Sequence, residues 1–287
     1  MNVTSRGLSG LIVGFGMGVP GSRSSGWLCT CRRSTHCFKP DEYVPPGRYK
    51  GIMNPGNPIL CAIDTAELGR AQALVAGVRD AVGGIKLGLE FFTANGPAGV
   101  RQVVEGTMPL FLDLKLHDIP NTVGRAVRSA AELEPLLLTL HTAGGPAMME
   151  AARDAADLAA SEGKRRVKLL GVTVLTSLDD GDLSAIGQQG PVGEQARRLA
   201  LLARDSGLDG VVCAPLEVAM LREVCGPDFL LVVPGIRPSG AASADQKRVM
   251  GPRAAIQAGA DYLVIGRPIT EATHPAAAAQ AILNELR

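Results

Sequence analysis

Two carboxylates and a lysine stand close together at the end of an otherwise apolar stretch of the chain. They are Asp113, Lys115 and Asp118, in the segment LDLKLHDIPNT. Side chains alternate along a β-strand, so we expect Asp113 and Lys115 on one face, with Cα atoms ~6.8 Å apart and leucines on the other face. Pro120 should end the strand by His117 and leave Asp118 on a loop. Because charges inside a sheet are costly, this pattern indicates a site that uses them chemically.

Two purely structural interpretations stay open for these residues. Asp113 and Lys115 could form a salt bridge in a barrel core, where the pair would serve the fold alone. Asp118 could cap a helix that begins near Asn121, because a carboxylate there accepts hydrogen bonds from the first main-chain N–H groups. The spacing alone does not decide between these interpretations and a catalytic site.

The composition favours a globular α/β protein without a strong overall charge. The chain has 287 residues, of which 46% are hydrophobic, and this is enough for a large core. Its 29 basic and 28 acidic side chains leave a net charge of +1, so no overall field favours nucleic acid or an anionic membrane. Residues 11–20 are too short and too rich in glycine to span a bilayer. Cys61, Cys213 and Cys225 are typical of small buried residues in a reducing cytoplasm.

Residues 1–52 differ in composition from the rest, and we expect a disordered extension before a single domain at 53–287. Glycine, serine, arginine and cysteine dominate this segment, and no acidic residue precedes Asp41. The composition is typical of a transit peptide, but Met53 would make a natural start, so an over-extended reading frame is an equal alternative. The Cys-x-Cys and His-Cys pairs in this segment fit no common zinc spacing, and we expect no metal site there.

From residue 57 onward, short runs of Val, Ile and Leu alternate with alanine-rich helical stretches. This alternation is typical of repeated strand-helix units and a parallel sheet. Eight such units in about 235 residues predict a (β/α)8 TIM barrel, whose usual length is ~250 residues. The expected strands are 59–63, 85–89, 110–114, 136–140, 168–174, 210–213, 230–233 and 262–265.

Polar residues follow most of these strands, and the catalytic face of such barrels lies at the carboxyl ends of the strands. The residues are Asp64, Lys86, Asp113 with Lys115, His141, Thr176 with Ser177, Arg237 and Arg267. After the seventh and eighth strands, Gly235 with Arg237 and Gly266 with Arg267 occupy the place where these barrels usually bind phosphate. We therefore expect a phosphorylated substrate. Turn glycines with solvated arginines are the alternative, and we expect His141 to be a structural histidine.

The segment Asp-x-Lys-x-x-Asp-Ile-Pro-Asn-Thr resembles the signature of the orotidine 5′-phosphate decarboxylase family, and the resemblance extends over residues 57–287. It implies a TIM barrel that converts orotidine 5′-monophosphate to uridine 5′-monophosphate and carbon dioxide in pyrimidine biosynthesis. It implies no metal and no organic cofactor. It also implies a homodimer in which Asp118 and Thr122 complete the site of the neighbouring subunit.

The resemblance also assigns roles to other residues. Lys115 is implied as the proton donor, and Asp113 is implied to lie beside the departing carboxylate. Lys86 and Asp64 resemble residues that contact ribose, Lys86 also joining the charged network, whereas Thr176 and Ser177 resemble those that meet the pyrimidine. The phosphate, which the barrel position already assigns to Arg237, Gly266 and Arg267, is implied to be gripped by Arg267 and Gln246. The family has the sequence Gly-Asp-Gln in the loop that contains Gln246, whereas this chain has Ala244-Asp245-Gln246. The substitution keeps the glutamine but replaces the glycine that would serve as a hinge of the loop.

Two other functions fit the same pattern. A sugar-phosphate decarboxylase or aldolase of the same superfamily would hold a magnesium ion through the carboxylates of the motif. The residues that argue against it are Asn121, Thr122, Thr176, Ser177 and Gln246. A barrel that only binds a phosphorylated metabolite would use its charges structurally.

Overall fold

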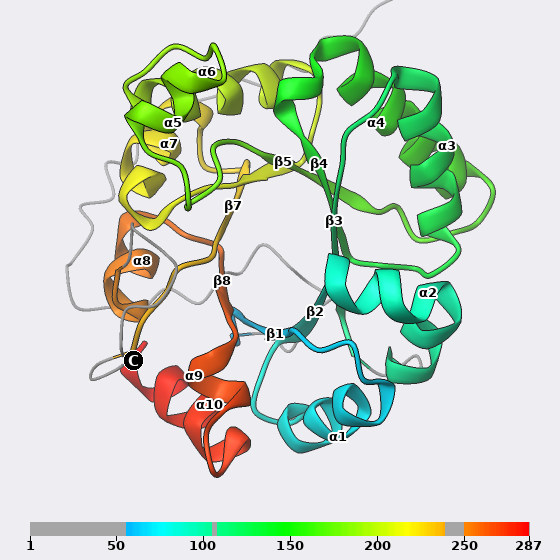
Figure 1. The fold of residues 1–287 in the computed structure, drawn as a ribbon, viewed down its shortest axis with the longest axis vertical. Coiled ribbons are helices and arrows are strands. Elements are labelled where there is room, and N and C mark those ends of the chain that lie inside the picture. Colours follow the sequence, from blue (N-terminus) through cyan, green and yellow to red (C-terminus); the bar gives the residue numbers. More distant parts are fainter. Residues whose placement is uncertain (1–55, 105–107, 239–249, 287) are drawn as a thin grey trace, which may run out of the picture. The chain divides into compact units, whose positions relative to one another are not determined.

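The computed structural model describes residues 56–104, 108–238 and 250–286. Parallel strands in these ranges close into one barrel in the order β1 to β8, with helices around the outside (Figure 1). This architecture confirms the predicted (β/α)8 barrel. Residues 1–52, the expected boundary at residue 53 and Gln246 lie outside the described residues, so the expectations for them stay predictions.

The strand positions agree with the sequence prediction to within about two residues. The strands are β1 (Ile59–Ile63), β2 (Gly84–Gly88), β3 (Leu110–Leu116), β4 (Leu137–His141), β5 (Lys168–Val172), β6 (Gly210–Val212), β7 (Leu230–Val233) and β8 (Tyr262–Ile265). The α-helices are α1 (Leu68–Val78), α2 (Leu89–Val104), α3 (Pro120–Ala131), α4 (Pro146–Ser161), α5 (Asp180–Ala185), α6 (Val192–Asp205), α7 (Val218–Cys225), α8 (Pro252–Ala258), α9 (Arg267–Thr270) and α10 (Pro275–Glu285). Two 3₁₀ turns, Thr142–Gly144 and Pro215–Glu217, follow β4 and β6.

The interior of the barrel is apolar at its floor and charged at its mouth. Side chains of one cluster fill the interior, namely Leu60, Ala62, Phe111, Leu136, Leu137, Leu170, Leu230, Val232, Tyr262 and Val264. Because inward positions recur at every second residue of a strand, the next inward residues of β2, β3 and β4 are Lys86, Asp113 and Thr139. All three are at most 9% exposed. The charged residues therefore rest on a packed apolar base, and a second, larger cluster packs between the strands and the helices.

Strand β3 departs from regular geometry where the motif begins. Between the pairs Leu112–Leu138 and Leu116–Leu140, the register advances by four residues on β3 but by only two on β4. Lys115 lies inside this bulge with φ of 50°, a left-handed conformation that is uncommon outside glycine. The expected strict alternation through Lys115 is therefore wrong. The bulge nevertheless leaves Lys115 on the same side as Asp113, as the contact below shows.

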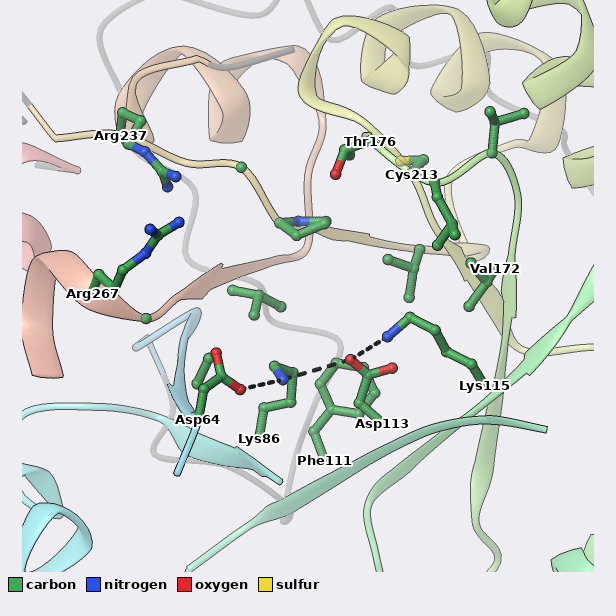
Figure 2. Close-up of a pocket in the computed structure, with 18 residues that line it drawn as sticks. Asp64, Lys86, Phe111, Asp113, Lys115, Val172, Thr176, Cys213, Arg237 and Arg267 are labelled. Carbon is green, nitrogen blue, oxygen red and sulfur yellow. Dashed lines mark hydrogen bonds and ion pairs between the residues drawn. The ribbon is translucent and has the colours of Figure 1, made fainter. Parts of the chain in front are cut away.

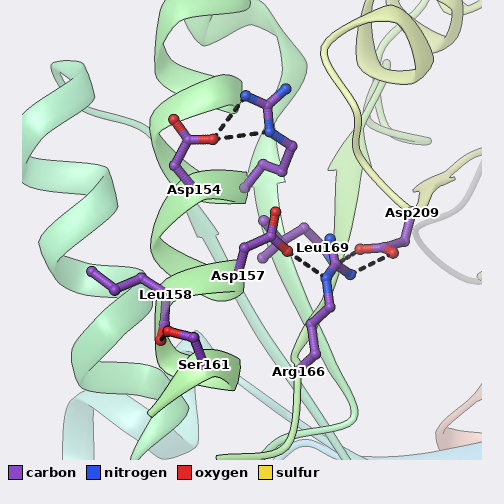
Figure 3. A network of polar contacts seen from close by, with 8 residues as sticks. Asp154, Asp157, Leu158, Ser161, Arg166, Leu169 and Asp209 are labelled. Atoms are coloured by element: carbon purple, nitrogen blue, oxygen red, sulfur yellow. Dashed lines mark hydrogen bonds and ion pairs between the residues drawn. The ribbon is translucent and has the colours of Figure 1, made fainter. Parts of the chain in front are cut away.

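Two carboxylates join neighbouring strands at the amino end of the barrel. Asp209 accepts a hydrogen bond of 2.8 Å from the main-chain N–H of Leu169 and one of 2.7 Å from Arg166, which also contacts Asp157 at 2.6 Å (Figure 3). Asp261, before β8, repeats this pattern with the N–H of Leu231 and with Arg222. These contacts tie β5 to β6 and β7 to β8 at the end opposite the predicted site.

Within the described ranges, no helix combines the length and the apolar character that crossing a membrane requires. Cys61, Cys213 and Cys225 are free thiols and are buried, as the sequence predicted.

Asp209→Ala should lower the free energy of unfolding by about 1–3 kcal/mol, because the N–H of Leu169 and the Arg166 guanidinium both lose an acceptor. Urea denaturation measures this change. Asp154→Ala is the matched control, since its ion pair with Arg153 is exposed and should contribute little. Equal effects of the two substitutions would show that the contact between β5 and β6 does not stabilise the barrel.

Candidate active site

A cavity of about 260 Å³ opens at the carboxyl ends of the strands and collects most of the predicted site residues (Figure 2). The predicted residues that line it are Asp64, Lys86, Asp113, Lys115, Thr176, Arg237, Gly266 and Arg267. They come from the ends of β1, β2, β3, β5, β7 and β8. The cavity thus brings residues that are far apart in the sequence to one place.

The charged residues form a chain of contacts across one wall of the cavity. The Lys115 Nζ lies 2.8 Å from Asp113 Oδ2, and the Lys86 Nζ lies 3.6 Å from the same oxygen. Lys86 also donates to Asp64 Oδ1 at 3.2 Å. Negative and positive charges therefore alternate from Asp64 through Lys86 and Asp113 to Lys115. The dashed lines in Figure 2 mark the contacts between them. The side chains of Lys86 and Asp113 are each 11% exposed, so this interaction is little screened by water.

Burial and charge act in opposite directions on Asp113. Burial raises the pKa of this carboxyl, but the ammonium groups of Lys86 and Lys115, together with hydrogen bonds from Lys115 and Thr139, outweigh burial and lower the pKa below its ordinary value. Asp113 is therefore ionised at neutral pH. The site holds a fixed negative charge against a fixed positive one before any ligand arrives.

Two arginines lie on the opposite side of the cavity. Arg237 follows β7, Arg267 follows β8, and their guanidinium groups approach each other in Figure 2. Gly235 has φ of 80°, so a side chain at this position would strain the turn before Arg237. A Cβ on Gly266 would be in ordinary van der Waals contact with the Cβ of Ala62, at 3.4 Å, so the turn before Arg267 packs directly against β1. The geometry suits a dianion held by two forked donors.

Three predicted site residues do not line the cavity of this single chain. Asp118, Thr122 and Ser177 are all exposed. The Oδ1 of Asp118 accepts from the N–H of Ile119 at 2.6 Å, whereas helix α3 begins at Pro120 with Ile119 as its N-cap. The alternative that the Asp118 side chain caps this helix is therefore wrong. Ser177 stands one residue beyond Thr176, which does reach the cavity.

The remaining lining is mostly apolar, and our sequence prediction did not include it. Phe111, Val172, Val212, Cys213 and Pro234 form much of this surface. Burial raises the pKa of the Cys213 thiol well above its ordinary value, so the thiol stays neutral. Alternation along the strands could have placed Phe111 and Val172 inside the barrel, but nothing in their residue types indicates a site.

His141 is not among the residues that line the cavity. Its ring centroid lies 5.5 Å from that of His117. Burial, and then the nearby His117 and Lys115, lower the pKa of His141. A neutral imidazole packed beside the site agrees with the structural role that we expected.

Lys86→Met should move acid unfolding to higher pH. Since the folded pKa of Asp113 is lowered, its charge contributes stability above the pKa of the unfolded carboxyl, and this contribution is lost as the pH falls through the lowered folded value. Without the Lys86 ammonium the folded pKa rises, so the contribution becomes smaller and disappears at a higher pH. Urea unfolding at a series of acidic pH values measures this shift.

Asp64→Asn is the control for Lys86→Met, because the Asp64 side chain is 60% exposed and contacts Lys86 rather than Asp113. It should leave the acid limb, that is, the fall of the free energy of unfolding at acidic pH, close to that of the unsubstituted protein. An unchanged acid limb in Lys86→Met would mean that Lys86 does not keep Asp113 ionised.

Known proteins are similar to this chain in sequence. The model of the family described as "Orotidine 5'-phosphate decarboxylase / HUMPS family" matches residues 57–282. A relative from Rhodospirillum rubrum, named orotidine 5'-phosphate decarboxylase, is 56% identical over 232 residues, which cover 80% of this chain and 94% of the relative. A relative of the same name from Paramagnetospirillum magneticum is 54% identical over 231 residues, covering 80% of this chain and 98% of the relative.

The fold is also similar to solved structures. The crystal structure of orotidine 5'-phosphate decarboxylase from Lactobacillus acidophilus superposes with a TM-score of 0.71 at 37% identity, covering 80% of this chain and 99% of that chain. The family model matches the part of the chain that forms the barrel. The chain therefore belongs to the orotidine 5'-phosphate decarboxylase / HUMPS family.

Proposed function

We propose that this chain converts orotidine 5′-monophosphate to uridine 5′-monophosphate and carbon dioxide, the last step of pyrimidine nucleotide synthesis. One observation carries the proposal: the Lys115–Asp113 pair and the guanidinium groups of Arg237 and Arg267 line the same cavity. A nucleotide with its phosphate at the arginines can extend its base toward Lys115. The names of the relatives that match 80% of this chain support the same reaction.

The reaction needs fixed charge because its intermediate has no internal means of stabilisation. When the bond from C6 to the carboxylate breaks, the electron pair stays in the plane of the pyrimidine ring, where the π system cannot delocalise it. The Lys115 ammonium is the group we assign to stabilise this pair and then to transfer its proton to C6. Ionised Asp113 would lie near the substrate carboxylate and disfavour the bound substrate relative to the transition state. Lys115 then recovers a proton from solvent.

The other cavity residues fit the rest of the nucleotide. We assign Arg237, Gly266 and Arg267 to the phosphate and Asp64 and Lys86 to the ribose, whereas Thr176 and Ser177 would meet the pyrimidine. Gln246 stays assigned to the phosphate from the sequence alone. Binding energy from the phosphate can then hold the base against the charges. The assignment needs neither a metal ion nor an organic cofactor.

We propose that the active form is a homodimer. Asp118 and Thr122 lie on an exposed segment, and Ile119 between them is 66% exposed, a large apolar side chain for a surface. In a two-fold dimer this segment would reach the neighbouring cavity and place Asp118 beside the charged network. We also propose a cytoplasmic location, because the buried free thiols suit a reducing compartment.

A spectrophotometric assay tests the reaction directly. Mixing the protein with orotidine 5′-monophosphate should remove the ultraviolet absorbance of the orotate ring, with and without a chelator. No change of this absorbance, together with turnover of a ketulose phosphate that is lost on chelation, would support the metal-dependent sugar-phosphate reaction instead. Tight binding of the nucleotide without any spectral change would support a barrel that only binds its ligand.

Lys115→Ala should fold and bind uridine 5′-monophosphate but lower kcat by at least about a thousandfold, because the proton donor is lost. Kinetic measurement of kcat and titration with the nucleotide separate these two properties. Lys164→Ala is the control, since Lys164 pairs with Glu132 on the surface and should turn over at the unsubstituted rate. Near-normal turnover by Lys115→Ala would show that Lys115 is not the proton donor.

Mixing two inactive variants tests the dimer. Lys115→Ala and Asp118→Ala should each be inactive alone. After unfolding and refolding together in equal amounts, half of the dimers carry one of each, and one of their two sites has both residues intact. About one quarter of the original activity should therefore return. No recovery, with both variants dimeric, would show that Asp118 does not act across the interface.

A further inference from the structure

Thr139 is a buried polar residue beneath the charged network that no step of the proposed reaction uses. It lies in the middle of β4 and is 0% exposed. A hydroxyl with no access to water must find its partners within the protein, because an unsatisfied one is costly. Both partners of Thr139 belong to the catalytic motif.

The hydroxyl of Thr139 bridges the two central residues of that motif. Its Oγ1 donates to Asp113 Oδ1 at 2.8 Å and accepts from the main-chain N–H of Lys115 at 2.9 Å. An ionised carboxylate only accepts hydrogen bonds, so the single proton of the hydroxyl must point to Asp113, and a lone pair is left for Lys115. The hydroxyl therefore donates one hydrogen bond and accepts another at the same time.

The bridge lies at the bulge of β3. Thr139 keeps its regular pairing with Leu170 of β5, whereas on the other side the register with β3 is interrupted. Lys115 is not among the residues of β3 that pair with β4, and its N–H donates to the threonine hydroxyl. The left-handed conformation of Lys115, with φ of 50°, costs free energy in a residue with a side chain. The hydrogen bond to Thr139 offsets part of this cost.

The two oxygens of Asp113 are then held by different groups. Oδ1 accepts from Thr139, and Oδ2 faces Lys115 at 2.8 Å and Lys86 at 3.6 Å. The carboxylate plane cannot turn without losing one of these contacts. Thr139 thus acts on both members of the pair: on Asp113 through its side chain and on Lys115 through its main chain.

We propose that Thr139 is a positioning residue of this site, whose hydroxyl holds the Lys115 backbone in the bulge and fixes the Asp113 carboxylate before the substrate arrives. This inference rests on the proposed decarboxylation. Thr139 does not line the cavity, so it acts through its neighbours. Its loss should misplace the reacting charges while the phosphate site stays intact.

Thr139→Val removes the hydroxyl and keeps the branched shape, and it should lower kcat by about 10- to 100-fold, because small displacements of reacting groups are costly. KM for orotidine 5′-monophosphate and the affinity for uridine 5′-monophosphate should stay near their original values. Thr139→Ser restores a hydroxyl and should recover most of kcat. Should Thr139→Val not fold, Thr139→Ala replaces it in the comparison.

Thr142→Val is the matched control. Thr142 is also 0% exposed, and its hydroxyl donates to the carbonyl oxygen of Val172 at 2.8 Å, away from the charges. It should lower stability and leave kcat unchanged. Equal losses of kcat in Thr139→Val and Thr142→Val would overturn the proposal, as would normal kcat in Thr139→Val or a failure of serine to restore it.

A second measurement is independent of turnover. Loss of the Thr139 hydroxyl removes one hydrogen bond that lowers the pKa of Asp113, so the acid limb of stability should move to higher pH in Thr139→Val but not in Thr139→Ser. If the unsubstituted protein shows no turnover, the proposed function fails, and this shift still tests the bridge. An unshifted acid limb would overturn the bridge even in an active enzyme.

Discussion

The site depends on a buried carboxylate held between two ammonium groups. Asp113 alone in this position would take up a proton, and Lys86 and Lys115 without it would repel each other at close range. The two ammonium groups outweigh the burial of Asp113 and keep this carboxyl ionised. The arrangement therefore exists before a ligand binds, and the protein need not reorganise as negative charge develops on a substrate.

The barrel provides what this arrangement needs. Apolar residues fill the interior below the network, so the charges have a low-dielectric base on one side and the cavity on the other. Parallel strands deliver side chains from distant parts of the sequence to one end. The carboxylate contacts of Asp209 and Asp261 lie at the opposite end, where they join strands without competing for the site.

The bulge of β3 also helps to position the charged residues. A regular strand would also place Asp113 and Lys115 on one face, with their Cα atoms about 6.8 Å apart. The bulge instead displaces the main chain of Lys115, and a neighbouring hydroxyl stabilises it there. The network in Figure 2 is thus built by main-chain geometry as well as by charge.

Much of this could be predicted from the sequence. The alternation of apolar runs with helical stretches predicted all eight strands of the barrel, and polar residues at strand ends predicted the charged lining of the cavity but not its apolar lining. The bulge and the role of Thr139 could not be predicted, because register between β3 and β4 depends on contacts between residues that are far apart in the chain. The exposure of Asp118 and Thr122 likewise follows from the three-dimensional path of the chain from the end of β3 into the first turn of α3.

The most direct test of the central claim is a crystal structure with uridine 5′-monophosphate bound. The account predicts the phosphate at the guanidinium groups of Arg237 and Arg267, and C6 of the pyrimidine within about 3.5 Å of the Lys115 Nζ, with Asp113 still paired to that amine. A nucleotide bound with its phosphate elsewhere, or with C6 facing away from Lys115, would contradict it.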